Sequence, residues 1–127
     1  MIIVAIDEID INKATAIIEN LDPKKCMIKI GSVSFSCFGH KIVNYVAEKG
    51  FDIFLDLKLH DIPNTVKKSI EGLTSLPILM LTIHTSGGKN MMLAAMEAVS
   101  NSKIKVFGVT ALTSLSDTDT NKIYQRT

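Results

Sequence analysis

Three charged residues, Lys29, Asp56 and Lys58, lie within two short and otherwise apolar runs of the chain. One apolar residue separates Asp56 from Lys58, and residues two apart on a strand share a face, about 6.6 Å apart along it. The two charged side chains should therefore point the same way, and Lys29 can join them from a neighbouring strand. A solvated surface ion pair would not need a matching lysine on a second apolar strand, so we interpret the three residues as a functional cluster.

An ammonium group held beside a carboxylate has a definite chemical use. The carboxylate favours the protonated lysine, which can stabilise a developing carbanion and then give it a proton. Loss of CO₂ from a carbon that has no electron sink requires such a group. At about 4 Å and an effective dielectric of about 20, one cation contributes roughly 4 kcal/mol, or about a thousandfold in rate. Enzymes typically lower barriers by at least about 8 kcal/mol, so binding energy from remote parts of the substrate must supply more.

The elements that must position these residues recur along the chain. Apolar runs start roughly 26 residues apart, and segments with helical spacing of apolar residues lie between them, which predicts strand–helix units and a parallel sheet. We expect strands at residues 2–6, 26–30, 52–57, 78–83 and 103–109. We expect helices at residues 11–21, 41–49, 64–76 and 91–99, and the start of another between residues 114 and 127.

Two α/β architectures fit five such units. One is an open, doubly wound sheet, for which 127 residues suffice. The other is a (β/α)₈ TIM barrel, which usually needs about 200 residues or more. Residues 114–127 contain no closing element, so we expect residues 1–127 to be the N-terminal part of a single barrel domain, incomplete here at about five βα units. Ligands bind at the C-terminal ends of parallel strands in both architectures, and each predicted strand ends in polar residues.

The composition argues against several classes of function. Fourteen basic and 13 acidic residues give a net charge of +1, which disfavours electrostatic binding to nucleic acid or to membranes. Cys26 and Cys37 have no metal-ligand spacing and are too few for a disulfide framework, which predicts reduced thiols. No apolar run is long enough for a signal peptide or a membrane span. We therefore expect a cytoplasmic protein.

The segment DLKLHDIPNTV at residues 56–66 resembles the signature of the orotidine 5′-phosphate decarboxylase family. Other segments resemble the family in the expected order along essentially the whole chain: AID at 5–7, IKIG at 28–31, HTSGG at 84–88 and VTALTS at 109–114. The resemblance implies conversion of orotidine 5′-monophosphate to uridine 5′-monophosphate and CO₂ in pyrimidine biosynthesis. It also implies that neither a metal nor an organic cofactor takes part.

The resemblance implies a role for each matching charged residue. Lys58 would be the acid that protonates C6 of the pyrimidine, and Asp56 would lie near the departing carboxylate. Asp7 and Lys29 would bind the ribose hydroxyls, with Lys29 also part of the charged cluster.

Five further residues receive roles from the same resemblance. Asp61 would act across the interface of a homodimer, in the partner's site, with Ile62 and Thr65 beside it. Thr113 or Ser114 would contact the pyrimidine.

The family's main phosphate-binding segment, which includes an arginine after a late strand, is expected beyond residue 127. The only arginine of this chain is Arg126. Without that segment, and with two barrel edges unpaired, we expect the isolated chain to be inactive or poorly folded.

Three alternatives stay open. Relatives in the same suprafamily act on sugar phosphates with a similar Asp-x-Lys-x-x-Asp core and use Mg²⁺, although the HDIPNT continuation favours the pyrimidine enzyme. A signalling receiver domain shares the length, Asp56 after strand three and Thr82 in strand four, but it needs a lysine where this chain leads to Thr110. The third is a non-catalytic half-barrel that is stable only when a partner binds it.

Overall fold

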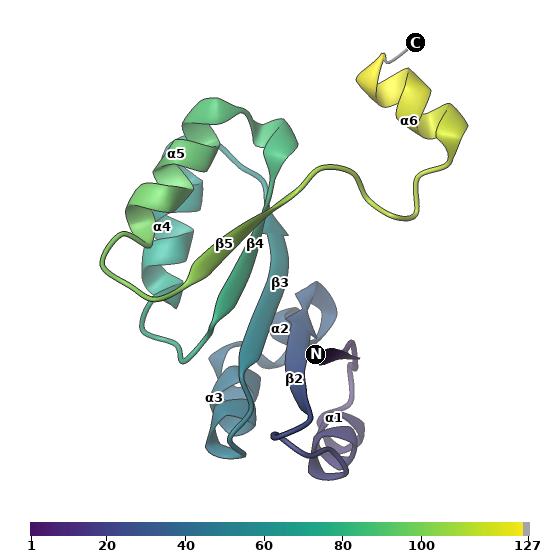
Figure 1. Ribbon diagram of the computed structural model, residues 1–127, viewed down its shortest axis with the longest axis vertical. Helices are drawn as coiled ribbons and strands as arrows, with labels where there is room; N and C mark the ends of the chain where they lie inside the picture. The colour runs from purple at the N-terminus through teal and green to yellow at the C-terminus, as the bar shows by residue number, and fades with distance from the viewer. Residues whose placement is uncertain (126–127) are drawn as a thin grey trace.

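A single parallel sheet forms the centre of the computed structural model, which describes residues 1–125 (Figure 1). Arg126 and Thr127 lie outside the described residues. The strands are β1 (Ile2–Ile6), β2 (Cys26–Gly31), β3 (Ile53–Leu59), β4 (Met80–His84) and β5 (Lys105–Val109). Every predicted strand is present, with bounds within three residues of those expected.

Helices connect the strands and follow the last one. They are α1 (Ile11–Glu19), α2 (Ser32–Phe38), α3 (His40–Glu48), α4 (Pro63–Leu73), α5 (Lys89–Ala98) and α6 (Asp117–Tyr124), with a 3₁₀ turn η1 (Thr85–Gly87). All the predicted helices are present, and α2 is an additional one. No helix in this part of the chain combines the length and the apolarity that crossing a bilayer requires.

The order of the strands distinguishes the two predicted architectures. Each strand pairs in parallel with the next one along the chain, in the order β1-β2-β3-β4-β5. A doubly wound sheet reverses direction once, and receiver domains have the order 2-1-3-4-5. The sequential order is that of a β/α barrel, so the sheet confirms a partial barrel and rules out the receiver domain.

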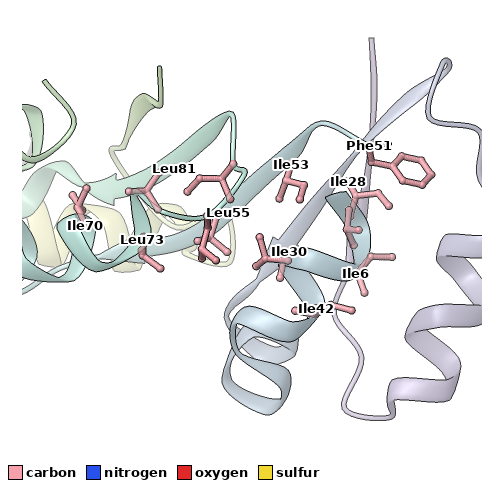
Figure 2. Close-up of a cluster of buried hydrophobic side chains, with 14 of the residues drawn as sticks. Ile6, Ile28, Ile30, Ile42, Phe51, Ile53, Leu55, Ile70, Leu73 and Leu81 are labelled. Carbon is pink, nitrogen blue, oxygen red and sulfur yellow. The ribbon is translucent and has the colours of Figure 1, made fainter. Parts of the chain in front are cut away.

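One face of the sheet packs against the helices. Alternate residues of the three central strands, together with residues of α1, α3, α4 and α5, form one buried cluster (Figure 2). Its strand members include Ile28, Ile30, Ile53, Leu55, Leu81 and Ile83. Each such side chain contributes roughly 1.5–3 kcal/mol when it is fully buried. Because strand side chains alternate between faces, this apolar set places the intervening residues, including Lys29, Asp56 and Thr82, on the other face, the inner face of a barrel.

The end of β3 departs from regular strand geometry. Leu55 pairs with Leu81 and Leu59 pairs with Ile83, so four steps along β3 match only two along β4. Within this irregular stretch Lys58 has a φ of 48°, in the left-handed region that a lysine rarely adopts. The expected regular strand geometry between Asp56 and Lys58 is therefore wrong, because the strand bulges between Leu55 and Leu59.

Candidate active site

Asp56 is the centre of a compact group of polar side chains on the inner face. Its Oδ2 atom lies 2.8 Å from Nζ of Lys58 and 3.2 Å from Nζ of Lys29. Its Oδ1 atom accepts a hydrogen bond of 2.8 Å from the hydroxyl of Thr82. Asp56 is only 7% exposed, so these contacts replace most of the water that the carboxylate would otherwise bind. The structure thus brings Lys29, Asp56 and Lys58 together, as the sequence predicts.

These contacts determine the charge of Asp56. Burial raises the pKa of its carboxyl group, but the hydrogen bonds from Lys58, Thr82 and Lys29, together with the charge of Lys58, lower it by more. The net effect is a pKa below the usual range for aspartate, so Asp56 is ionised at neutral pH. The site therefore consists of one carboxylate between two cationic lysine side chains.

A cavity of about 420 Å³ opens onto this group. The charged cluster, Phe54 and Thr82 line one part of it, and the chain that follows β5 lines another part with Thr113 and Ser114. Its volume falls within the usual range for small-molecule sites, about 300–1,000 Å³. The structure therefore brings the two predicted pyrimidine contacts to the same cavity as Lys58.

Asp7 lies at the end of β1, beside the strand that carries Lys29. A Cβ atom at Gly31 would overlap the Asp7 carboxylate, so the glycine at the end of β2 lets this side chain keep its position close to the strand. The hydroxyl of Ser34 accepts a hydrogen bond of 2.9 Å from the Glu8 N–H and donates one of 3.0 Å to the Glu8 carbonyl. Ser34 is fully buried, so α2 fixes the loop that presents Asp7.

The other predicted residues lie outside this cavity in the described chain. Asp61, Ile62 and Thr65 are exposed, between the end of β3 and the first turn of α4. The Asp61 carboxylate accepts a hydrogen bond of 2.7 Å from the N–H of Ile62.

Thr82 is a member of the site that the sequence did not predict. Its place between Leu81 and Ile83 in β4 was the available signal, because alternation puts it on the face of Lys29.

The fold and the site define a class: a β/α-barrel protein with a lysine–carboxylate cluster on its inner face, next to a cavity at the ends of the strands. The family model described as orotidine 5′-phosphate decarboxylase / HUMPS matches residues 1–127, and the chain belongs to this family. The predicted family resemblance is thereby confirmed.

Individual relatives agree with this assignment. The chain is 50% identical over 122 residues to orotidine 5′-phosphate decarboxylase of Ehrlichia canis, covering 96% of this chain and 54% of the relative. The enzyme of Ehrlichia chaffeensis is 48% identical over 122 residues, which cover 96% of this chain and 53% of that protein. The crystal structure of orotidine 5′-phosphate decarboxylase from Lactobacillus acidophilus superimposes with a TM-score of 0.86 at 34% identity, covering 99% of this chain and 59% of that chain. The chain thus spans about half the length of the curated relatives it matches.

Proposed function

We propose that the full-length protein carrying this sequence decarboxylates orotidine 5′-monophosphate to uridine 5′-monophosphate and CO₂. One observation carries the proposal: in a member of this family, Lys58 lies 2.8 Å from an ionised and nearly buried Asp56 on the wall of a cavity. An ammonium group in that position can face a carbanion formed in the cavity.

The reaction needs one bond to break and one to form. The bond between C6 and the carboxylate carbon breaks, CO₂ leaves, and the electron pair remains on C6. The Lys58 ammonium stabilises this carbanion and transfers a proton to C6, which leaves a neutral amine that regains a proton from water. Asp56, beside the departing carboxylate, holds the Lys58 and Lys29 ammonium groups in place. No metal or organic cofactor takes part in these steps.

The rest of the cavity would bind the nucleotide. Lys29 and Asp7 would hold the ribose hydroxyls. Lys29 lines the cavity, and Asp7 directly follows β1, the strand that pairs with the strand of Lys29. Thr113 or Ser114 would contact the pyrimidine from the segment that follows β5. Their hydroxyl groups can both donate and accept hydrogen bonds, as the imide of a pyrimidine requires.

We also propose a homodimer in which Asp61 reaches the partner's site, with Ile62 and Thr65 beside it. Support comes from the exposure of all three residues, with Ile62 66% exposed although it is apolar.

A cytoplasmic location is proposed as well, since Cys26 and Cys37 are both free thiols.

The family description itself provides a second candidate, because it joins orotidine 5′-phosphate decarboxylases with the HUMPS group. Relatives in the same suprafamily that act on sugar phosphates and use Mg²⁺ are the alternative that the sequence resemblance left open. Dependence on Mg²⁺ therefore separates the two candidates.

The test is a direct assay of the full-length protein. Purified protein is incubated with orotidine 5′-monophosphate, with and without EDTA, and uridine 5′-monophosphate is quantified by chromatography. We expect turnover that EDTA does not reduce, and a particle of twice the protomer mass in sedimentation. Absence of the product, or activity only on a sugar phosphate with added Mg²⁺, would contradict the proposed reaction.

A further inference from the structure

Thr82 connects the two charged residues of β3 through a single hydroxyl group. The side chain lies on the neighbouring strand β4 and is 3% exposed. Its Oγ1 atom accepts a hydrogen bond of 2.9 Å from the backbone N–H of Lys58 and donates one of 2.8 Å to Oδ1 of Asp56. A threonine hydroxyl has only one hydrogen, and a backbone N–H can only donate, so the direction of both bonds is determined.

The backbone of Lys58 needs such support. Its φ of 48° lies where residues other than glycine are strained, and strained backbone persists only where the surroundings hold it. The irregular pairing between Leu55 and Leu59 moves this part of β3 out of register with β4. The Lys58 N–H donates a hydrogen bond to the Thr82 hydroxyl. This side chain therefore provides the acceptor for the backbone at the bulge.

The other bond orients the carboxylate. Thr82 occupies Oδ1 of Asp56, and the lysines share Oδ2, at 2.8 Å for Lys58 and 3.2 Å for Lys29. Both ends of the ion pair between Asp56 and Lys58 are therefore tied to the same atom of β4. Thr82 holds the lysine through its main chain and the aspartate through its side chain.

We propose that Thr82 is a positioning residue that sets the distance and orientation of the Lys58 ammonium relative to Asp56. The inference rests on the proposed function in one respect, because the reaction that Lys58 serves is the proposed decarboxylation. The geometric part, that one hydroxyl holds both residues, does not depend on which reaction takes place.

The test compares Thr82→Val with Thr82→Ser in the full-length protein. Valine keeps the shape of threonine and removes the hydroxyl, whereas serine keeps the hydroxyl. For Thr82→Val we expect kcat to fall roughly 100-fold, the loss that a misplacement of about 1 Å can cause, with little change in KM. Thr82→Ser should recover most of kcat. As a matched control, Thr74→Val removes a hydroxyl that donates to the Glu71 carbonyl at the end of α4, away from the cavity, and should leave kcat unchanged.

Two further readouts separate positioning from a general loss of stability. The Thr82 hydrogen bond lowers the pKa of Asp56, so in Thr82→Val the Asp56 carboxyl should titrate at higher pH in a ¹³C NMR experiment, and the acid limb of kcat should move the same way. In the wild-type protein the Lys58 amide should be protected from hydrogen exchange. This last measurement tests the inference even if Thr82→Val does not fold.

The outcomes are distinct for the two proposals. Failure of the wild-type protein to convert orotidine 5′-monophosphate would reject the proposed function. The Asp56 titration and the Lys58 amide exchange would still test whether the Thr82 hydroxyl holds Asp56 and Lys58. Wild-type kcat with an unchanged Asp56 titration in Thr82→Val would overturn the positioning role. So would equal losses in the valine and serine variants, or a Lys58 amide that exchanges as fast as an unbonded one.

Discussion

At the scale of single residues, Asp56 controls the electrostatics of the site. Its pKa is lowered in the folded protein, whereas an aspartate in an unfolded chain titrates at about 3.9. Ionised Asp56 therefore adds stability that is present above about pH 4 and is lost as the pH falls through the lowered folded-state pKa.

Asp56→Asn should remove this pH dependence. We expect the free energy of unfolding of the wild-type protein to fall more steeply below pH 4 than that of the variant, in urea titrations of the full-length protein. At neutral pH the variant should be less stable, because Lys29 and Lys58 then face one another without a counter-charge. Asp52→Asn, at an exposed aspartate just before β3, controls for the removal of any acidic residue. If the free energy of unfolding fell equally steeply below pH 4 in the wild-type protein and in Asp56→Asn, the expectation would be wrong.

Alternation of apolar and charged residues was sufficient to predict that Lys29, Asp56 and Lys58 meet. The detailed geometry was not predictable, because it depends on the pairing between β3 and β4. The bulge at Lys58 and its bond to Thr82 exist only in that pairing, and neither strand shows them when it is considered alone.

At the scale of secondary-structure elements, α2 shows how packing overrides local preference. Its sequence, SVSFSCF, is rich in residues that favour strands or caps and has no clear apolar period. It lies between Gly31 and Gly39, the latter with a φ of 57°, and it buries Ser34 against the loop that carries Asp7. The contact that stabilises the helix joins it to a loop 26 residues away, so the sequence offered no local signal.

Ser34→Ala should therefore be costly. It leaves the N–H and the carbonyl of Glu8 without their partner, and we expect a loss of about 1–3 kcal/mol in the free energy of unfolding. Ser36→Ala is the matched control, since Ser36 is exposed on the same helix and should change stability by no more than about 0.5 kcal/mol. Urea titration of the full-length variants measures both. Equal effects in the two variants would mean that Ser34 does not fix this loop.

At the scale of the whole molecule, the sheet formed by the described residues has two edges. β1 pairs only with β2 and β5 only with β4, and apolar side chains on both edge strands are open to solvent, including Ile2, Ile3 and Phe107. Unpaired edges and exposed apolar surface promote association between chains. In a closed barrel, further strands would pair with both edge strands and cover their exposed apolar side chains.

Residues 1–127 alone should therefore behave differently from the full-length protein. We expect the isolated chain to lack decarboxylase activity and to self-associate or melt without cooperativity, whereas the full-length protein melts cooperatively. Sedimentation and thermal unfolding, each done on both proteins, check this expectation. If the isolated chain were monomeric and melted cooperatively, the expectation that residues 1–127 do not fold stably by themselves would be wrong.

The repeat of strands and helices predicted a parallel sheet, but it could not give the order of the strands. A doubly wound sheet and a barrel contain the same strand–helix units and differ in which strands become neighbours. That difference arises from contacts between elements far apart in the sequence. The resemblance of residues 56–66 to a known family favoured the barrel, and the pairing of the five strands established it.

The most direct test of the proposed chemistry is the turnover of Lys58→Ala in the full-length protein. Loss of the ammonium group should lower kcat at least about a thousandfold, while circular dichroism and binding of uridine 5′-monophosphate show a folded protein. Lys68→Ala, at an exposed lysine of α4, should keep wild-type turnover. Wild-type turnover by Lys58→Ala would show that another group protonates the carbanion.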